Sequence, residues 1–111
     1  MKLVLFAYRD CGYECLNYLI SIDKKPLLVV IPKEEDQKEK VFKSVKNLAI
    51  RFNIKFLEFE KNNKNLEKEI KLLKPDYAFS CYFPYIIDAN ILRLFAKYSF
   101  NIHGAILPAY K

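Results

Sequence analysis

The stretch Leu3-Val4-Leu5-Phe6-Ala7-Tyr8 is an unbroken apolar run near the start of the chain, and Arg9-Asp10-Cys11-Gly12 follows it directly. A run without polar alternation predicts a β-strand that is buried on both faces, as in a parallel sheet. Asp10 is a good N-cap residue, and it predicts that a helix begins here. The residues expected to share one face of this helix are Gly12, Cys15, Leu16, Leu19 and Ile22. A buried strand that passes into a helix is the first half of a βαβ unit.

Strand and helix signals continue to alternate along the chain. Further strand signals lie at residues 27–31, 54–59, 76–82 and 99–102. Apolar residues with helical spacing lie between them, at 41–52, 66–73 and 88–95. Pro32 is expected to close the second strand, and Asp88 to cap the last helix. This order predicts right-handed crossovers and therefore an α/β fold: a Rossmann-like doubly wound, mainly parallel sheet.

The composition is that of one folded domain with a basic surface. The 111 residues are 52% hydrophobic and 29% charged, and they include 9 Phe and 8 Tyr. The net charge of +6 comes mainly from Lys, interleaved with Glu and Asn as on solvated helix faces. Phosphate and base recognition favours Arg, so we expect no nucleic-acid partner. Neither a G-x-G-x-x-G nor a P-loop motif occurs, which disfavours those two kinds of nucleotide site.

The three cysteines, Cys11, Cys15 and Cys81, predict reduced thiols and a cytoplasmic location, since their number is odd and we find no secretory signal. The apolar runs are far shorter than the roughly 20 residues of a membrane span, so we expect no membrane partner. Cys11 and Cys15 have the i, i+4 spacing that would allow a metal site with His103. Without a C-x-x-C pair or a fourth ligand, small core thiols are the favoured interpretation, and we expect no metal.

Ligands of a doubly wound sheet bind beyond the carboxyl ends of its strands. The segments expected there are residues 7–12, 81–87 and 101–111. Strand alternation places Asn101 and His103 on the same side of the last strand, where a hydrogen-bond donor and a titratable imidazole converge on one reacting atom. A single histidine is more often a structural side chain, so position alone leaves both interpretations open.

The segment Asn101-Ile102-His103 is followed by Gly104-Ala105-Ile106-Leu107-Pro108-Ala109-Tyr110-Lys111. It resembles the signature Asn-x-His-x-Ser-Leu-Leu-Pro-x-Tyr-Arg/Lys of the folate-dependent formyltransferases. Phe6-Ala7-Tyr8-Arg9-Asp10-Cys11-Gly12, Lys74-Pro75-Asp76 and Phe79-Ser80-Cys81-Tyr82 occur in the order expected of the amino-terminal half of such an enzyme. The resemblance is strongest to the sugar-nucleotide N-formyltransferases, such as those acting on UDP-4-amino-4-deoxy-L-arabinose.

This resemblance implies formyl transfer from 10-formyltetrahydrofolate to the primary amine of a nucleotide-linked amino sugar. It implies that Asn101 donates a hydrogen bond to the oxyanion of the tetrahedral intermediate and that His103 moves a proton. The residues implied to hold the folate are Tyr85, Ile86 and Ile87. The residues implied to contact the sugar nucleotide are Tyr8, Arg9, Gly12, Pro108 and Tyr110. A homo-oligomer is compatible with this interpretation.

The chain departs from the family pattern at several positions. Ala105 replaces the usual Ser, Pro84 stands where a polar or basic residue is common, and the later catalytic Asp has no counterpart before Lys111. We therefore expect residues 1–111 to be the amino-terminal part of a catalytic domain, truncated after the fifth strand and inactive alone. The alternatives are a methionyl-tRNA formyltransferase, which the Lys excess would suit, and a non-catalytic nucleotide-binding α/β module.

Overall fold

A computed structural model describes residues 2–33 and 43–102 of the chain. The strands are β1 (Leu3–Ala7), β2 (Leu28–Pro32), β3 (Phe56–Phe59), β4 (Tyr77–Cys81) and β5 (Tyr98–Ile102). The helices are α1 (Arg9–Ser21), α3 (Val45–Arg51), α4 (Lys64–Leu73) and α5 (Ala89–Leu92). None of the helices within these two ranges combines the length and the apolar character needed to cross a membrane.

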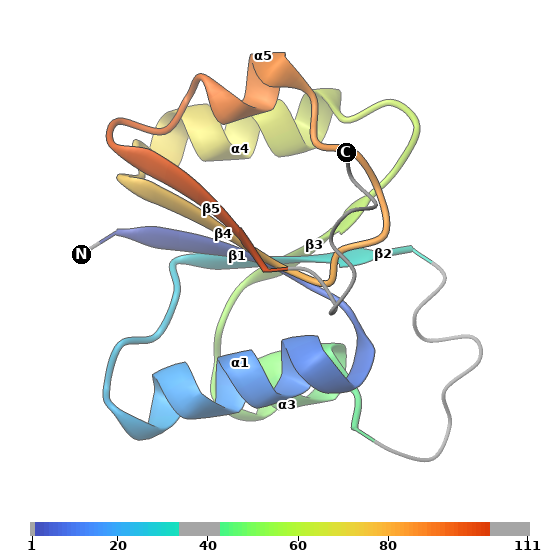
Figure 1. Ribbon diagram of the computed structural model, residues 1–111, viewed down its shortest axis with the longest axis vertical. Coiled ribbons are helices and arrows are strands. Elements are labelled where there is room, and N and C mark those ends of the chain that lie inside the picture. The colour runs from blue at the N-terminus through green and yellow to red at the C-terminus, as the bar shows by residue number, and fades with distance from the viewer. Residues whose placement is uncertain (1, 34–42, 103–111) are drawn as a thin grey trace.

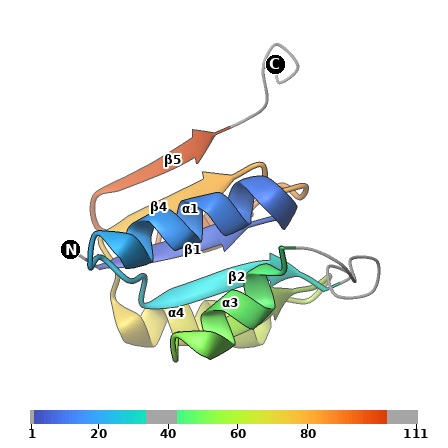
Figure 2. The same ribbon diagram turned by 90° about the horizontal axis from the view of Figure 1, so that it is seen from below.

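The five strands form one sheet in the order β3-β2-β1-β4-β5, and every neighbouring pair is parallel. Helices α1 and α3 cover one face of the sheet, and α4 and α5 cover the other (Figure 1). Figure 2 shows α1 and α3 in front of the strands, with β5 at one edge. The predicted Rossmann-like, doubly wound α/β fold is therefore confirmed, and all the pairings are parallel rather than most of them.

Burial of β1 on both faces explains its unbroken apolar sequence. All five of its residues are buried. Val4 and Phe6 belong to the core cluster under α4 and α5, whereas Leu5 and Ala7 belong to the cluster under α1 and α3. Because successive side chains of a strand point to opposite faces, a strand covered on both sides needs apolar residues at every position.

Several predicted element boundaries are wrong by a few residues. Pro32 is the last residue of β2 and pairs in register with Phe59, so it lies inside the strand that it was expected to close. Tyr8, rather than Asp10, occupies the N-cap position of α1, and Asp10 lies in the first turn. Ile22 is the C-cap residue of α1 and is 42% exposed, so it does not share the buried face with Leu16.

Helices α3 and α5 are shorter than the apolar spacing predicts, whereas α4 begins two residues before the predicted range and ends with it at Leu73. In α3, Ser44 is the N-cap, and its hydroxyl accepts a hydrogen bond from the amide of Asn47 at 3.1 Å. This cap starts the described helix at Val45, and positions 41 and 42 lie outside the described residues. Asp88 is the N-cap residue of α5 without a side-chain capping bond, and Phe95 is buried although the helix ends at Leu92.

Gly12 sets how closely α1 approaches the end of β1. A Cβ atom added at Gly12 would lie 2.7 Å from the Cβ of Ala7 and 2.8 Å from its carbonyl carbon. Two carbons cannot approach that closely, and the clash is partly with main-chain atoms that have little freedom to move. The small side chains at positions 7 and 12 therefore allow the first turns of α1 to lie directly on the sheet.

Gly12→Ala is expected to lower the free energy of unfolding by about 1–2 kcal/mol, because overpacking outweighs the better helix propensity of alanine. Urea unfolding followed by circular dichroism measures this change. Asn17→Ala, on the exposed side of the same helix, is the matched control and should leave stability unchanged or slightly raised. Equal or greater stability of Gly12→Ala would show that the helix does not rest on Ala7.

Candidate functional site

The centre of the sheet contains a point where the chain leaves two neighbouring strands toward opposite faces. β1 and β4 are paired in register, with Ala7 opposite Cys81 at their carboxyl ends. From β1 the chain enters α1 on one face, and from β4 it leads to α5 on the other (Figure 1). Such a switch point is where open α/β sheets bind ligands. The predicted site segments 7–12 and 81–87 both begin there.

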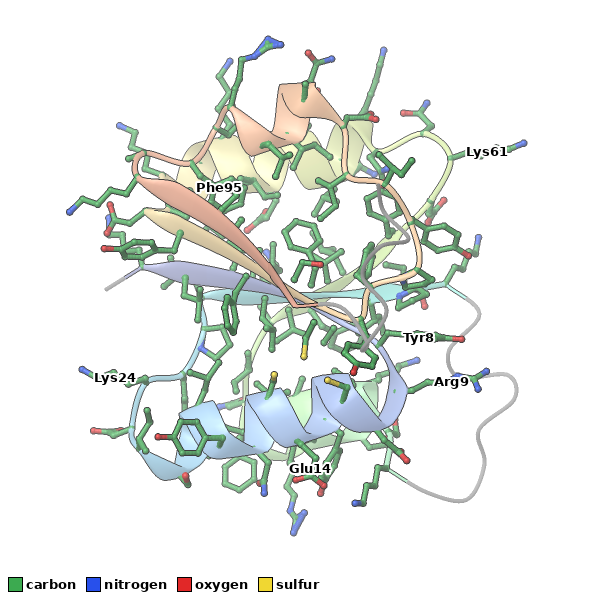
Figure 3. The ribbon with its side chains drawn as sticks, in the orientation of Figure 1. Tyr8, Arg9, Glu14, Lys24, Lys61 and Phe95 are labelled. Carbon is green, nitrogen blue, oxygen red and sulfur yellow. The ribbon has the colours of Figure 1, made fainter. Side chains whose placement is uncertain are left out.

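Tyr8 and Arg9 lie together at the exit from β1. Tyr8 is extended, and Arg9 takes a positive φ of 48° as α1 begins. The guanidinium carbon of Arg9 lies 4.9 Å from the centre of the Tyr8 ring, a cation–π distance. Figure 3 shows the two side chains next to each other at this end of α1. The structure thus brings two of the predicted substrate residues together, and it gives the third, Gly12, a packing role.

The exit from β4 is also conformationally unusual. Tyr82, the first residue after the strand, has a φ of 54°, a value that costs an L-residue energy and that non-glycine residues adopt rarely. The next residue, Phe83, is anchored by edge-to-face contacts with Phe6 at 5.5 Å and with Phe59 at 5.2 Å between ring centres. Strained backbone held by its surroundings is a feature that clusters at ligand sites. Both exits of the switch point have it.

The predicted folate-binding residues lie on one side of the switch point, beside a hollow of about 690 Å³. The ring of Tyr85 stacks on that of Phe59, with centres 5.6 Å apart and an interplanar angle of 8°. Tyr85 and Ile86 both line the hollow, and Ile86 is 90% exposed. Ile87 instead is half-buried and packs against the core. Two of the three predicted residues are therefore placed where a ligand can reach them.

The other wall of this hollow comes from residues that the sequence interpretation missed. They follow the carboxyl ends of β2 and β3 and include Phe59, Asn63 and two cations, Lys33 and Lys61. The carboxyl-end rule applied to β3 would have indicated Phe59 as a candidate. Tyr8, Arg9 and Gly12 do not line this hollow. The predicted substrate and folate residues are thus on separate surfaces of the described structure.

Asn101 lies near the carboxyl end of β5. Its backbone is in register with Ser80 of β4, which is in turn in register with Phe6 of β1. The predicted catalytic residue therefore belongs to the row of residues just before the switch point. His103, Pro108 and Tyr110 lie outside the described residues.

The three cysteines meet on the face of the sheet that α1 covers. Cys81 ends β4, and its sulfur lies 2.9 Å from that of Cys11 and 2.8 Å from that of Cys15. All three sulfurs lie within 4.8 Å of one another. The sulfur atoms, yellow in Figure 3, are seen between α1 and the sheet. The sequence placed Cys11 and Cys15 one helical turn apart but did not bring Cys81 to them.

Hydrogen bonding within this cluster shifts the pKa values of Cys15 and Cys81 in opposite directions. The hydrogen bond with Cys81 lowers the pKa of Cys15 from the usual 9.0 to about 7, against the opposing effect of burial. The pKa of Cys81 is raised, because its proton is held by Cys15 and because the residue is buried. Cys15 is therefore the more acidic of these two thiols and the more reactive toward electrophiles near neutral pH.

No protein-family model matches the chain. The chain is similar over its whole length to the bifunctional polymyxin resistance protein ArnA of Wigglesworthia glossinidia brevipalpis, with 37% identity over 114 aligned positions. The chain spans 17% of the length of that relative.

The lowered pKa of Cys15 predicts the pH dependence of its alkylation. In the presence of a chelator, the rate of its reaction with iodoacetamide should rise through a midpoint near pH 7, since only the thiolate reacts. Peptide mass spectrometry assigns the modified residue, and buried Cys81 should remain unmodified. Cys81→Ala is the control: loss of the donor should move the midpoint upward. A midpoint near 9 in the unsubstituted chain would contradict the hydrogen-bonded arrangement.

Proposed function

We propose that this chain, a formyltransferase-like domain, takes part in transferring the formyl group of 10-formyltetrahydrofolate to the primary amine of a nucleotide-linked amino sugar. The motifs that resemble those of the formyltransferases, together with the similarity to ArnA over the whole chain, support formyl transfer. The amino-sugar acceptor and the folate donor are the steps that we add. Free thiols on the described residues are in keeping with the cytoplasmic location that we propose.

The observation that carries the proposal is the position of Asn101. It stands in the row that also contains Phe6 and Ser80, just before the point where β1 and β4 send the chain to opposite faces. The family motif Asn-x-His therefore begins at the carboxyl edge of the sheet, where ligands of this fold bind. A motif that matched the family but lay at the amino edge would not support the same reaction.

In this proposal the amine attacks the formyl carbon, and a tetrahedral intermediate with a negatively charged oxygen forms. The side-chain amide of Asn101 donates a hydrogen bond to that oxygen, which lowers the barrier because the charge is largest in the transition state. His103 accepts the proton that the amine loses as the carbon–nitrogen bond forms. The bond between the formyl carbon and the folate nitrogen then breaks, and the proton held by His103 passes to that nitrogen, so that tetrahydrofolate leaves and the acceptor carries the formamide.

The hollow beside Tyr85 fits the folate donor in size and chemistry. Its volume of about 690 Å³ is that of a small-molecule site. The exposed ring of Tyr85 stacks on the buried ring of Phe59 and offers an aromatic surface for a flat heterocycle. Lys33 and Lys61 line the same hollow together with the acids Glu60 and Asp88. Lys33 is paired with Glu60 at 3.9 Å, so Lys61 is the lysine that we assign to a folate carboxylate. Tyr8 and Arg9, at the other exit, are the residues that we assign to the sugar nucleotide.

Two other functions predict different outcomes. A methionyl-tRNA formyltransferase would use the same donor but would formylate charged tRNA. A non-catalytic nucleotide-binding module would bind ligand with unchanged affinity after substitution of His103. The protein purified from its host is assayed with the amino-sugar nucleotide and with charged tRNA as acceptors. These assays distinguish the two functions from the one that we propose.

Asn101→Ala and His103→Ala are each expected to lower kcat for the amino-sugar nucleotide by roughly 100-fold or more, because each removes stabilisation of the transition state. Formylated product is quantified by mass spectrometry. Asn65→Ala, an exposed asparagine of α4, is the control and should retain full activity. Near-normal turnover by either variant would refute the assigned roles.

Tyr85→Ala is expected to weaken binding of a folate analogue by roughly 10-fold, because stacking of one aromatic ring contributes about 1 kcal/mol or more. Isothermal titration calorimetry measures the dissociation constant. Tyr18→Ala removes an exposed tyrosine from the outer side of α1 and should bind the analogue normally. Equal affinity of Tyr85→Ala and the unsubstituted protein would move the folate site away from this hollow.

A further inference from the structure

The three thiols form a cluster that the proposed formyl transfer does not use. Cys11 and Cys15 come from the first two turns of α1, and Cys81 comes from the end of β4. Chain segments separated by 66 to 70 positions thus bring three sulfur atoms together. No His, Asp or Glu side chain of residues 2–33 and 43–102 joins this group. A donor set of sulfur alone has a strong chemical preference.

We propose that Cys11, Cys15 and Cys81 together bind one soft, thiophilic cation of the d10 class, such as Zn²⁺, as three thiolate ligands. Thiolate sulfur selects such ions over hard cations like Mg²⁺, which prefer oxygen. This ligand set differs from the one considered from the sequence, which grouped Cys11 and Cys15 with His103 and lacked a fourth ligand. The three ligands come from two elements on either side of the switch point, so a bound ion would fix α1 to β4.

The spacing of the sulfurs suits one central ion. Three thiolates that each lie about 2.3 Å from a metal stand about 4 Å from one another. The closest pair in the structure is separated by 2.8 Å, and no pair exceeds 4.8 Å. Shifts of about an ångström, within the reach of side-chain rotation, convert the observed cluster into a trigonal set.

Burial and charge also favour the site. Cys81 is buried, whereas Cys11 and Cys15 are half-buried, so an ion can enter from their side. Each thiol releases its proton as the ion binds, and three thiolates with one divalent cation leave a single negative charge. Cys11 lies in the first turn of the 13-residue helix α1, where the positive end of the helix dipole stabilises that charge.

The test uses the full chain, reduced with a phosphine and stripped with a chelator. Cd²⁺ is the spectroscopic probe, because thiolate ligation gives it a charge-transfer absorption in the ultraviolet. We expect saturation at one Cd²⁺ per chain, with the two half-buried thiols, Cys11 and Cys15, protected from alkylation. Cys15→Ser and Cys81→Ser should each weaken binding by about 100-fold or more, since even loss of a supporting residue can cost 10–100-fold.

Two controls make the result decisive. Asn17→Ala, one exposed position on the same helix, should bind Cd²⁺ as the unsubstituted chain does, and Mg²⁺ should not compete. The protection of thiols in the unsubstituted chain gives a result even where a Cys→Ser variant fails to fold.

Three outcomes would overturn the proposal. They are absence of the charge-transfer band, equal affinity in the Cys→Ser variants, and continued alkylation of either Cys11 or Cys15 at saturating Cd²⁺. A chain that takes up no Cd²⁺ but loses the mass of two hydrogens on exposure to a disulfide oxidant would assign the cluster to redox chemistry instead. None of these readouts depends on formyl transfer, so the site and the proposed function fail or stand separately.

Discussion

Enclosure of β1 by protein on all sides is the constraint on which the rest of the structure depends. It pairs with β2 along one edge and β4 along the other, and cores of apolar side chains cover both its faces. Neither edge nor face of this strand meets water, so the elements that follow it must pack around it. The departure into α1 and the opposite departure from β4 create the switch point.

The chain leaves β1 and β4 through turns that share a left-handed residue but differ in their side chains. At the end of β1, small residues let a helix begin against the sheet, and Arg9 takes a left-handed backbone conformation. At the end of β4, the left-handed residue is Tyr82, and the edge-to-face rings around Phe83 hold the turn in place. One exit presents a cation beside a ring, and the other presents a stacked aromatic pair above a hollow. The two exits therefore present separate surfaces of different character.

Much of the fold was predictable because its signals are local. The apolar run at β1 and the alternation of strands with helices led directly to the parallel sheet. The carboxyl-end rule then led to the segments around Tyr8 and Tyr85. The parts that were missed depend on contacts between distant residues: Cys81 reaches Cys11 and Cys15 only through the pairing of β1 with β4. Likewise, the stacking of Tyr85 on Phe59 requires the order of strands, which no local pattern contains.

The step in side-chain size from Phe6 to Ala7 has a consequence for the register of β1. In a sheet with one solvent-exposed face, the alternation of polar and apolar residues fixes the register of a strand, because a shift by one residue would expose apolar side chains. Both faces of β1 are apolar, so polarity does not fix the register of this strand. Side-chain volume fixes the register instead. A shift by one position would bring the ring of Phe6 to the place of Ala7, where the main chain of α1 leaves no room. The register of the central strand is thus set by steric fit at one small residue, Ala7, and the other strands of the sheet are aligned with it.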